Sequence, residues 1–172
     1  MTFRYCPRCA TELEMRDSEP PDPPRPTCPN CGWVHYVNPT PTVQAWIDDD
    51  GRFHALERNQ EPLKGRWNLP GGFVEPDESG PEAIAREVKE ETGLDIEVVE
   101  NIGIFSSTYG EGEDRKPILD IAYLCRRTGG ELEISDESGA HETFTLQDFP
   151  EPAFEGERKA LALLRERRGI ST

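Results

Sequence analysis

Long apolar runs are missing from this chain of 172 residues, and basic residues are scarce. No stretch approaches the roughly 20 apolar residues that cross a bilayer, and the first residues lack the hydrophobic core of a secretory signal. Lys and Arg number 19 against 34 Asp and Glu, which gives a formal net charge of −15. Because nucleic-acid binding depends on clustered cations, we expect neither a nucleic-acid nor a membrane partner. A small phosphorylated ligand is compatible with this charge if a bound cation screens it.

Cysteine is also sparse, and its spacing argues against disulfides. Four of the five cysteines form two Cys-x-x-Cys pairs, Cys6 with Cys9 and Cys28 with Cys31. The fifth, Cys125, lies in an apolar run and is expected to be an unpaired buried thiol. Metal-type pairs and an odd thiol fit a reducing compartment, so we expect a cytoplasmic protein.

Composition divides the chain into three parts. Residues 1–36 hold all the paired cysteines and a proline-rich stretch, 18–26, that excludes helix and central strand. Residues 37–41 are predicted to be a stiff linker. Residues 42–172 have the length of one domain.

Within this domain the pattern predicts a mixed sheet covered by two helices. The first helix is expected at about 81–92, with Ser79 as N-cap, Glu82 completing a capping box and Gly93 ending it. The second is expected at about 156–168, with Ala160, Leu161 and Leu164 inward. Strands are expected at 42–47, 53–57, 67–69, 73–74, 96–99, 102–106, 118–125 and 142–146.

Three carboxylates gather on one side of the first predicted helix. At about 100° per residue, Glu87, Glu90 and Glu91 share an arc of roughly 100° beside an apolar stripe. Like charges at this spacing repel, and burial beside the stripe would desolvate them. A divalent cation such as Mg²⁺ removes both penalties, because it prefers carboxylate oxygen and binds phosphates. The alternative is an ordinary solvated acidic face.

The wider pattern favours the metal site. From Gly72 to Leu94 the chain reads Gly-x5-Glu-x7-Arg-Glu-aliphatic-x-Glu-Glu-x-Gly-aliphatic. This is the complete Nudix signature, and the chain resembles the Nudix hydrolase family over about residues 38–168. The resemblance implies an α/β/α sandwich around a mixed sheet. It also implies metal-dependent attack of water on a nucleoside diphosphate that is linked to another group.

The resemblance also assigns roles to individual residues. Glu87, Glu90 and Glu91 would hold Mg²⁺ or Mn²⁺, with Glu78 and the Gly72 carbonyl as lesser ligands. Arg86 would orient the glutamates by ion pairing.

The general base stays open among four glutamates. Two belong to the signature and two lie in the later part of the chain: Glu90, Glu91, Glu137 and Glu142.

The cysteine pairs have the arrangement Cys-x2-Cys-x18-Cys-x2-Cys. This spacing is typical of a tetrahedral zinc site, and each pair resembles a zinc knuckle. Four protein ligands leave no open position, so Cys6, Cys9, Cys28 and Cys31 predict a structural zinc ribbon. The alternative, a redox Cys-x-x-Cys, lacks a thioredoxin-like context. We expect the ribbon to dock on the catalytic domain or to form a homodimer.

Substrate identity is the least constrained feature. A zinc ribbon before a Nudix domain resembles the NADH pyrophosphatase group, which also carries Ser-Gln-Pro-Trp-Pro-Phe-Pro-x-Ser. The corresponding stretch here, Ile104 to Gly110 and the acidic residues after it, lacks this motif. We therefore expect ADP-ribose or a nucleoside diphosphate sugar, with Trp46 and Tyr109 as candidate base-stacking residues.

Three other functions stay open. The substrate could instead be NADH or another dinucleotide, or a nucleoside triphosphate. A function of a different class is a non-catalytic nucleotide sensor.

Overall fold

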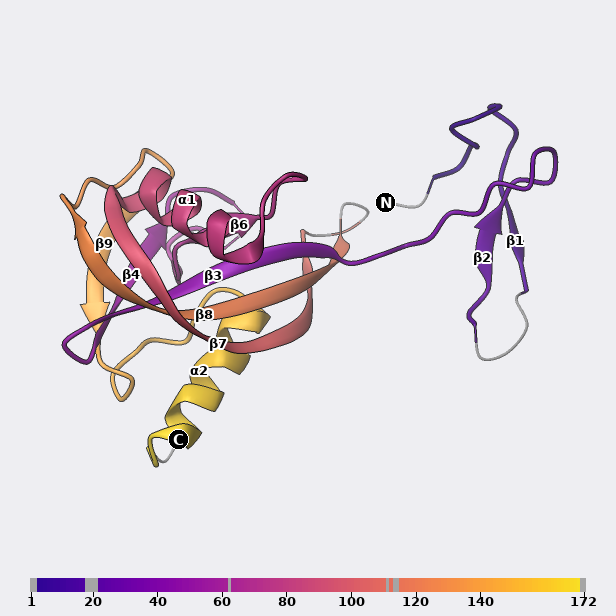
Figure 1. Cartoon of the computed structure of the whole chain (residues 1–172). Coiled ribbons are helices and arrows are strands. Elements are labelled where there is room, and N and C mark those ends of the chain that lie inside the picture. Colours follow the sequence, from indigo (N-terminus) through magenta and orange to yellow (C-terminus); the bar gives the residue numbers. More distant parts are fainter. Residues whose placement is uncertain (1–2, 18–21, 62, 111, 113–114, 171–172) are drawn as a thin grey trace.

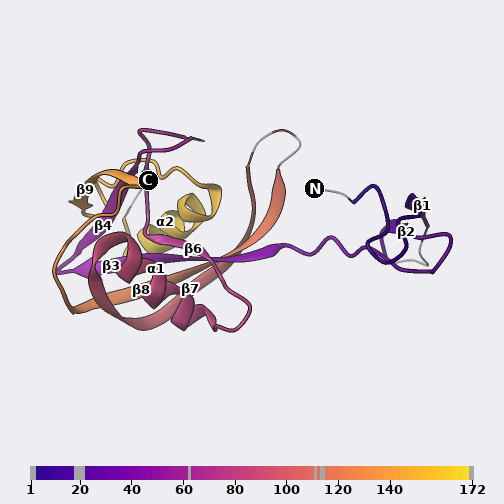
Figure 2. The same cartoon turned by 90° about the horizontal axis from the view of Figure 1, so that it is seen from above.

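The computed structural model describes residues 3–17, 22–61, 63–110, 112 and 115–170. Residues 18–21 of the predicted proline-rich stretch and the acidic residues Glu111, Glu113 and Asp114 after Gly110 lie outside these ranges. Two units are visible in Figure 1: a small two-stranded unit that contains the N-terminus, and a larger unit of sheet and helices. Both views place the small unit to one side, joined by an extended segment, and not packed on the large sheet (Figures 1 and 2).

The small unit is a short antiparallel sheet beside the cysteines. Met15 pairs with Pro26 at the centre of the register. Proline fits here because in a sheet of two strands every strand is an edge. The strands are β1 (Glu14–Arg16) and β2 (Arg25–Thr27).

In the described residues the larger unit is a seven-stranded mixed sheet, as the sequence predicts. The main path runs β5-β4-β3-β8-β7, β6 pairs with β3, and β9 pairs with β4. Of these pairs β3 and β8 are parallel, and the others are antiparallel. The strands are β3 (Thr40–Asp49), β4 (Arg52–Arg58), β5 (Trp67–Asn68), β6 (Gly71–Phe73), β7 (Leu94–Tyr109), β8 (Lys116–Gly130) and β9 (Ser138–Phe144).

One helix covers each face of this sheet (Figure 1). Strand β3 is buried on both faces. Its Val43, Ala45 and Ile47 belong to the core on the side of α1 (Gly80–Thr92), whereas Trp46 belongs to the core on the side of α2 (Glu155–Arg167). The α/β/α sandwich implied by the resemblance is therefore present.

Helix α1 begins and ends at the predicted signals. The Ser79 backbone N–H donates to the Glu82 carboxylate at 2.8 Å, which satisfies one of the otherwise unpaired groups of the first turn. Gly93 has φ of +70° and donates to the Lys89 carbonyl, a left-handed conformation that suits glycine. The predicted inward residues Ala160, Leu161 and Leu164 of α2 are buried.

Most strand boundaries differ from the prediction: β4 and β8 are longer at both ends, and β6 (71–73) begins inside the segment 70–72 that is expected as a turn. Strand β3 begins at Thr40, inside the predicted linker, because Pro41 needs no ladder donor there and its carbonyl accepts from Val74 N. The two strands expected at 96–99 and 102–106 are one strand, β7, in which bulges absorb the polar residues between them. Strand β9 covers 138–144 and not 142–146.

Candidate active site

The signature glutamates lie on α1 where it passes under β6. The carboxylate of Glu91 accepts the Gly71 backbone N–H at 2.9 Å. The pKa of Glu91 is raised to about 8, chiefly by burial and also by the charges of Glu87 and Glu137, against the effect of the Gly71 hydrogen bond. Burial also raises the pKa of Glu87. Both carboxylates are thus in a setting where negative charge is costly unless a cation compensates it.

Arg86 holds the other carboxylates in place. Its guanidinium donates to both oxygens of Glu78, to Glu87 at 2.9 Å and to Glu90 at 3.2 Å. A further bond reaches the Phe73 carbonyl at 3.1 Å. The predicted orienting role of Arg86 thus has a geometric basis in these contacts.

Gly72 allows β6 to approach α1 closely. A Cβ at this position would overlap the Glu87 carboxylate. A larger residue here would therefore force the Glu87 carboxylate out of its present position beside β6.

The donor set fits a hard divalent cation. Glu87, Glu90 and Glu91 follow the i, i+3, i+4 spacing that places them on one side of α1, and the Gly72 main chain lies against Glu87. In the described residues these carboxylate oxygens do not converge on one point, because Arg86 and the Gly71 N–H hold them. A cation would draw them together by replacing some of these contacts.

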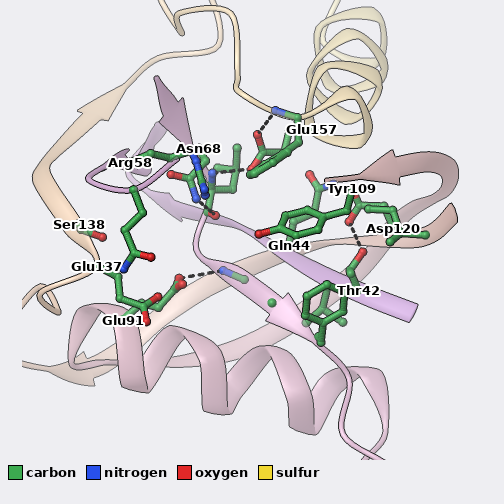
Figure 3. Close-up of a pocket in the computed structure, with 18 of the residues that line it drawn as sticks. Thr42, Gln44, Arg58, Asn68, Glu91, Tyr109, Asp120, Glu137, Ser138 and Glu157 are labelled. Atoms are coloured by element: carbon green, nitrogen blue, oxygen red, sulfur yellow. Dashed lines mark hydrogen bonds between the residues drawn. The ribbon is translucent and has the colours of Figure 1, made fainter. Parts of the chain in front are cut away.

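A cleft of about 210 Å³ opens beside Glu91 (Figure 3). Its walls come from β3, β4, β6, β8 and the segment before α2. Gly72, Tyr109 and Glu137 also line it, whereas Glu78, Glu87, Glu90 and Glu142 are not among its lining residues. The positively charged guanidinium of Arg58 is part of the cleft wall and lies over the Phe154 ring, 4.9 Å from its centroid.

The inner part of the cleft holds buried polar groups that sequence reasoning missed. Gln44 and Asp120 come from neighbouring strands, and Glu157 comes from the first turn of α2. Burial raises the pKa of Asp120, while Gln44 and Thr42 lower it. Burial also raises the pKa of Glu157 to about 8. The available signal was a Gln and an Asp inside strands that otherwise have apolar residues on both faces.

The candidate stacking residues have different positions. Tyr109 ends β7 at the cleft and contacts the rings of Phe73 and Phe154, at centroid distances of 5.6 and 5.8 Å. Trp46 has no exposed surface and packs against Phe149. The structure does not support Trp46 as a stacking partner, because the alternation of β3 turns it into the core.

The four paired cysteines meet in the small unit. The Sγ atoms of Cys6 and Cys31 are 3.6 Å apart, and that of Cys9 is 3.5 Å from Cys28 and 3.7 Å from Cys31. Tetrahedral Zn–S bonds of about 2.3 Å require sulfur separations of about 3.8 Å. In the described chain this is the single group of three or more Cys, His, Asp or Glu whose ligand atoms lie within 4.8 Å of one another.

Local hydrogen bonds favour the thiolate form of two of these cysteines, Cys28 and Cys9, whereas the pKa of Cys31 is raised to about 12. The Cys31 N–H donates to Cys28 Sγ at 3.4 Å, and this bond is the main cause that lowers the pKa of Cys28. Contacts with the Thr11 side chain and backbone lower the pKa of Cys9 to about 6. Cys125 is free and buried as predicted, and burial raises its pKa to about 12.

No helix in the described ranges is both long and apolar enough to cross a membrane. This agrees with the absence of long apolar runs in the sequence.

Comparison with known proteins identifies both units. The model of the NUDIX domain matches residues 38–164, and the zinc-ribbon model described as Nudix N-terminal matches residues 4–37. An ADP-ribose pyrophosphatase of Methanocaldococcus jannaschii is 37% identical over 123 residues, which are 72% of each chain. The NAD-capped RNA hydrolase NudC of Chromobacterium violaceum is 33% identical over 156 residues, which are 88% of this chain and 54% of that protein.

A solved structure supports the fold over the whole chain. The crystal structure of a NUDIX hydrolase from Nitrosomonas europaea aligns with a TM-score of 0.75 at 24% identity, and covers 99% of this chain and 96% of that one. At this identity the likeness establishes the fold alone. The family models and the glutamates on α1 agree with this fold. The chain belongs to the Nudix family: it is a divalent-metal-dependent Nudix pyrophosphohydrolase of nucleoside diphosphate substrates, with an N-terminal zinc ribbon.

Proposed function

We propose that this enzyme hydrolyses the diphosphate bond of ADP-ribose or a closely related nucleoside diphosphate sugar. The observation that carries the proposal is the match to a relative named ADP-ribose pyrophosphatase, over nearly three quarters of both chains. The absence of the Ser-Gln-Pro-Trp-Pro-Phe-Pro-x-Ser motif supports a diphosphate sugar over NADH.

The catalytic roles follow from the placement of the side chains. We propose that Glu87, Glu90 and Glu91 hold Mg²⁺ or Mn²⁺, with Glu78 and the Gly72 carbonyl nearby. When bound, such ions lower the pKa of water and neutralise the diphosphate. The Gly71 N–H fixes Glu91.

The general base is proposed separately. We assign it to Glu137, because Glu137 lines the cleft and is close enough to Glu91 to raise its pKa. Glu142 is exposed on β9 and accepts from the Thr143 N–H, its own neighbour, so it serves less well. Tyr109 would stack on the base.

A dinucleotide is the second candidate substrate, and one observation favours it. The relative from Chromobacterium violaceum matches across both the ribbon and the catalytic unit and is named as an NAD-capped RNA hydrolase. This chain spans only about half the length of that relative. The net charge of −15 supports small nucleotides over RNA.

The experiment compares substrates directly. Purified protein with Mg²⁺ is given ADP-ribose, NADH, nucleotide sugars and nucleoside triphosphates, and release of monophosphate is measured. We expect the highest kcat/KM with ADP-ribose and no turnover in the double variant Glu90→Gln, Glu91→Gln. The matched control is Glu97→Gln, which makes the same change at an exposed glutamate on β7. Turnover that is equal in wild type and double variant would support the non-catalytic sensor instead.

We also propose that the protein is cytoplasmic and forms a homodimer. Four free thiols in zinc-type geometry support a reducing, cytoplasmic setting. The exposed Phe3, Tyr5, Met15 and Tyr36 of the ribbon support the predicted homodimer over docking on its own catalytic unit. Light scattering gives the mass in solution, and a monomer at all concentrations would contradict the homodimer.

A further inference from the structure

Two buried polar side chains lie together at the inner end of the cleft. Gln44 on β3 is 3% exposed and Asp120 on β8 is 5% exposed. The parallel register sets Thr42 opposite Asp120, and Gln44 is two residues further along. Because side chains alternate along a strand, all three lie on the same face of the sheet. Figure 3 shows them around the same opening as Tyr109.

The amide of Gln44 has a fixed orientation. The indole N–H of Trp46 donates to Gln44 Oε1 at 3.0 Å, so the oxygen faces the core. The nitrogen, Nε2, has no hydrogen-bond partner among the described residues. Buried N–H donors are normally paired, and this one belongs to a residue that lines the cleft. Asp120 lies close enough for the Gln44 side chain to lower its pKa, but Nε2 makes no hydrogen bond of normal geometry in the described residues, so this donor is open to a ligand acceptor.

Asp120 supplies a hydrogen-bond acceptor beside this donor. The Thr42 hydroxyl donates to Oδ1 at 3.0 Å. The other oxygen lies against Gly156 in the first turn of α2, where a Cβ would overlap it. A carboxylate accepts up to about four hydrogen bonds, so the contacts with Thr42 and Gln44 leave Asp120 with capacity for a ligand donor.

Aromatic rings stand near this pair. Tyr109 is half-buried at the cleft and is tilted by 37° from Phe154. The ring of Phe73 meets Tyr109 edge-on at 86°. A flat ring could therefore stack on the Tyr109 wall while its edge points to Gln44 and Asp120.

An N–H donor beside a carboxylate acceptor matches one kind of base edge. Adenine presents an N6 amino donor next to a ring-nitrogen acceptor. Hypoxanthine and guanine present an oxygen at the same position, which would face the Asp120 carboxylate with like polarity. We propose that Gln44 and Asp120 form the base-reading site of this enzyme: Asp120 accepts from the adenine N6 amino group, and Gln44 Nε2 donates to the adjacent ring nitrogen. This assignment rests on the proposed function, because it names the base of that substrate.

Binding of AMP and IMP, without added divalent cation, tests the assignment directly. The two nucleotides differ at the six-position, where IMP has an oxygen in place of the amino group and a protonated ring nitrogen beside it. Calorimetry on the zinc-loaded full chain should give a Kd for AMP at least 10-fold below that for IMP. The wild-type ratio requires no variant: equal affinities, or no binding of AMP at millimolar concentration, would overturn the proposal.

The variant Asp120→Asn sharpens the test, because it keeps the shape and can turn a donor toward the IMP oxygen. We expect the AMP preference to fall at least 10-fold or to reverse. The control Asp95→Asn makes the same change at an exposed residue paired with Lys89 and should keep the wild-type ratio. An unchanged ratio in a folded Asp120→Asn protein would refute the assignment.

The binding ratio also separates this proposal from the proposed function. Selective AMP binding without hydrolysis of ADP-ribose would leave the base-reading site intact and overturn the substrate. Hydrolysis of ADP-ribose and its inosine analogue with equal kcat/KM would do the reverse.

Discussion

The guanidinium of Arg86 binds both oxygens of the Glu78 carboxylate, and thereby joins the middle of α1 to the turn that precedes it. The bond from Arg86 is the main cause that lowers the pKa of Glu78. Because the same guanidinium reaches Glu87, Glu90 and the Phe73 carbonyl, one side chain sets the positions of three carboxylates and of strand β6.

Replacing Arg86 with lysine should damage activity more than stability. Lysine keeps the charge but cannot form the planar two-point contact. We expect kcat/KM to fall by about 100-fold through misplaced ligands, and the free energy of unfolding to fall by about 1–3 kcal/mol. Steady-state kinetics and urea unfolding measure the two effects.

The matched control is Arg126→Lys. Arg126 pairs with Glu97 at a site where both side chains are more than half exposed. Surface pairs contribute little, so the free energy of unfolding should change by less than about 0.5 kcal/mol, with wild-type activity. Equal losses in the two variants would show that Arg86 has no special positioning role.

Zinc content gives a second prediction. Freshly purified, reduced protein should retain about one zinc per chain after dialysis, because four thiolates close the coordination sphere. Cys28→Ser removes a ligand whose sulfur is buried and accepts the Cys31 N–H, so this variant should lose most of its zinc. Elemental analysis measures the ratio.

Cys125→Ala is the control for zinc binding, because Cys125 is a buried thiol far from the ribbon in the sequence and outside the four-cysteine group. It should keep the wild-type zinc content. Well under one zinc per chain in the wild type would contradict the ribbon.

Replacement of Glu137 and of Glu142, the two candidate bases outside the signature, should have different effects on kcat. Glu137→Gln should lower kcat by about 100-fold or more, the usual contribution of a general base, since Glu137 lines the cleft. Glu142→Gln changes an exposed side chain on β9 and should leave kcat near the wild-type value. The reverse pattern would assign the base to Glu142, and two unaffected variants would return the role to a signature glutamate.

Local patterns accounted for α1 and the ribbon. Ser79, Glu82 and Gly93 bound the helix through contacts within a few residues, so the sequence alone carries that information. The Cys-x-x-Cys spacing does the same for each zinc knuckle. Helical periodicity then places the signature glutamates on one side of α1.

The inner cleft could not be predicted in this way. Thr42 and Asp120 meet across 78 positions of sequence, through a parallel register that no local pattern specifies. Trp46 was a candidate base-stacking residue because an aromatic side chain can either stack on a ligand or pack in a core. Only the burial of both faces of β3 shows that Trp46 belongs to the core. The joined strand β7 escaped prediction because bulges preserve pairing across polar residues.

The buried carboxyl of Glu157 should make stability depend on pH. It accepts the Leu69 N–H at 2.8 Å and the Phe154 N–H at 3.0 Å, and burial raises its pKa to about 8 from the ordinary value of 4.5. A raised pKa means that the folded state keeps the proton while the unfolded chain releases it. The contribution is therefore complete below pH 4.5 and is lost progressively as the pH rises to about 8.

Urea unfolding of wild type and Glu157→Gln between pH 5 and pH 8, at constant zinc, measures this contribution. Glutamine does not titrate, so the free-energy difference between wild type and variant should decline with pH, by at most about 1.4 kcal/mol per unit. Glu155→Gln is the control: Glu155 is half-exposed, and the hydrogen bond from Lys159 is the main cause that lowers its pKa. A lowered pKa affects stability only at more acid pH, so this difference should stay flat across the window. A wild-type-minus-Glu157→Gln difference that is equally flat would mean that Glu157 is ionised in the folded enzyme, held by its two backbone donors.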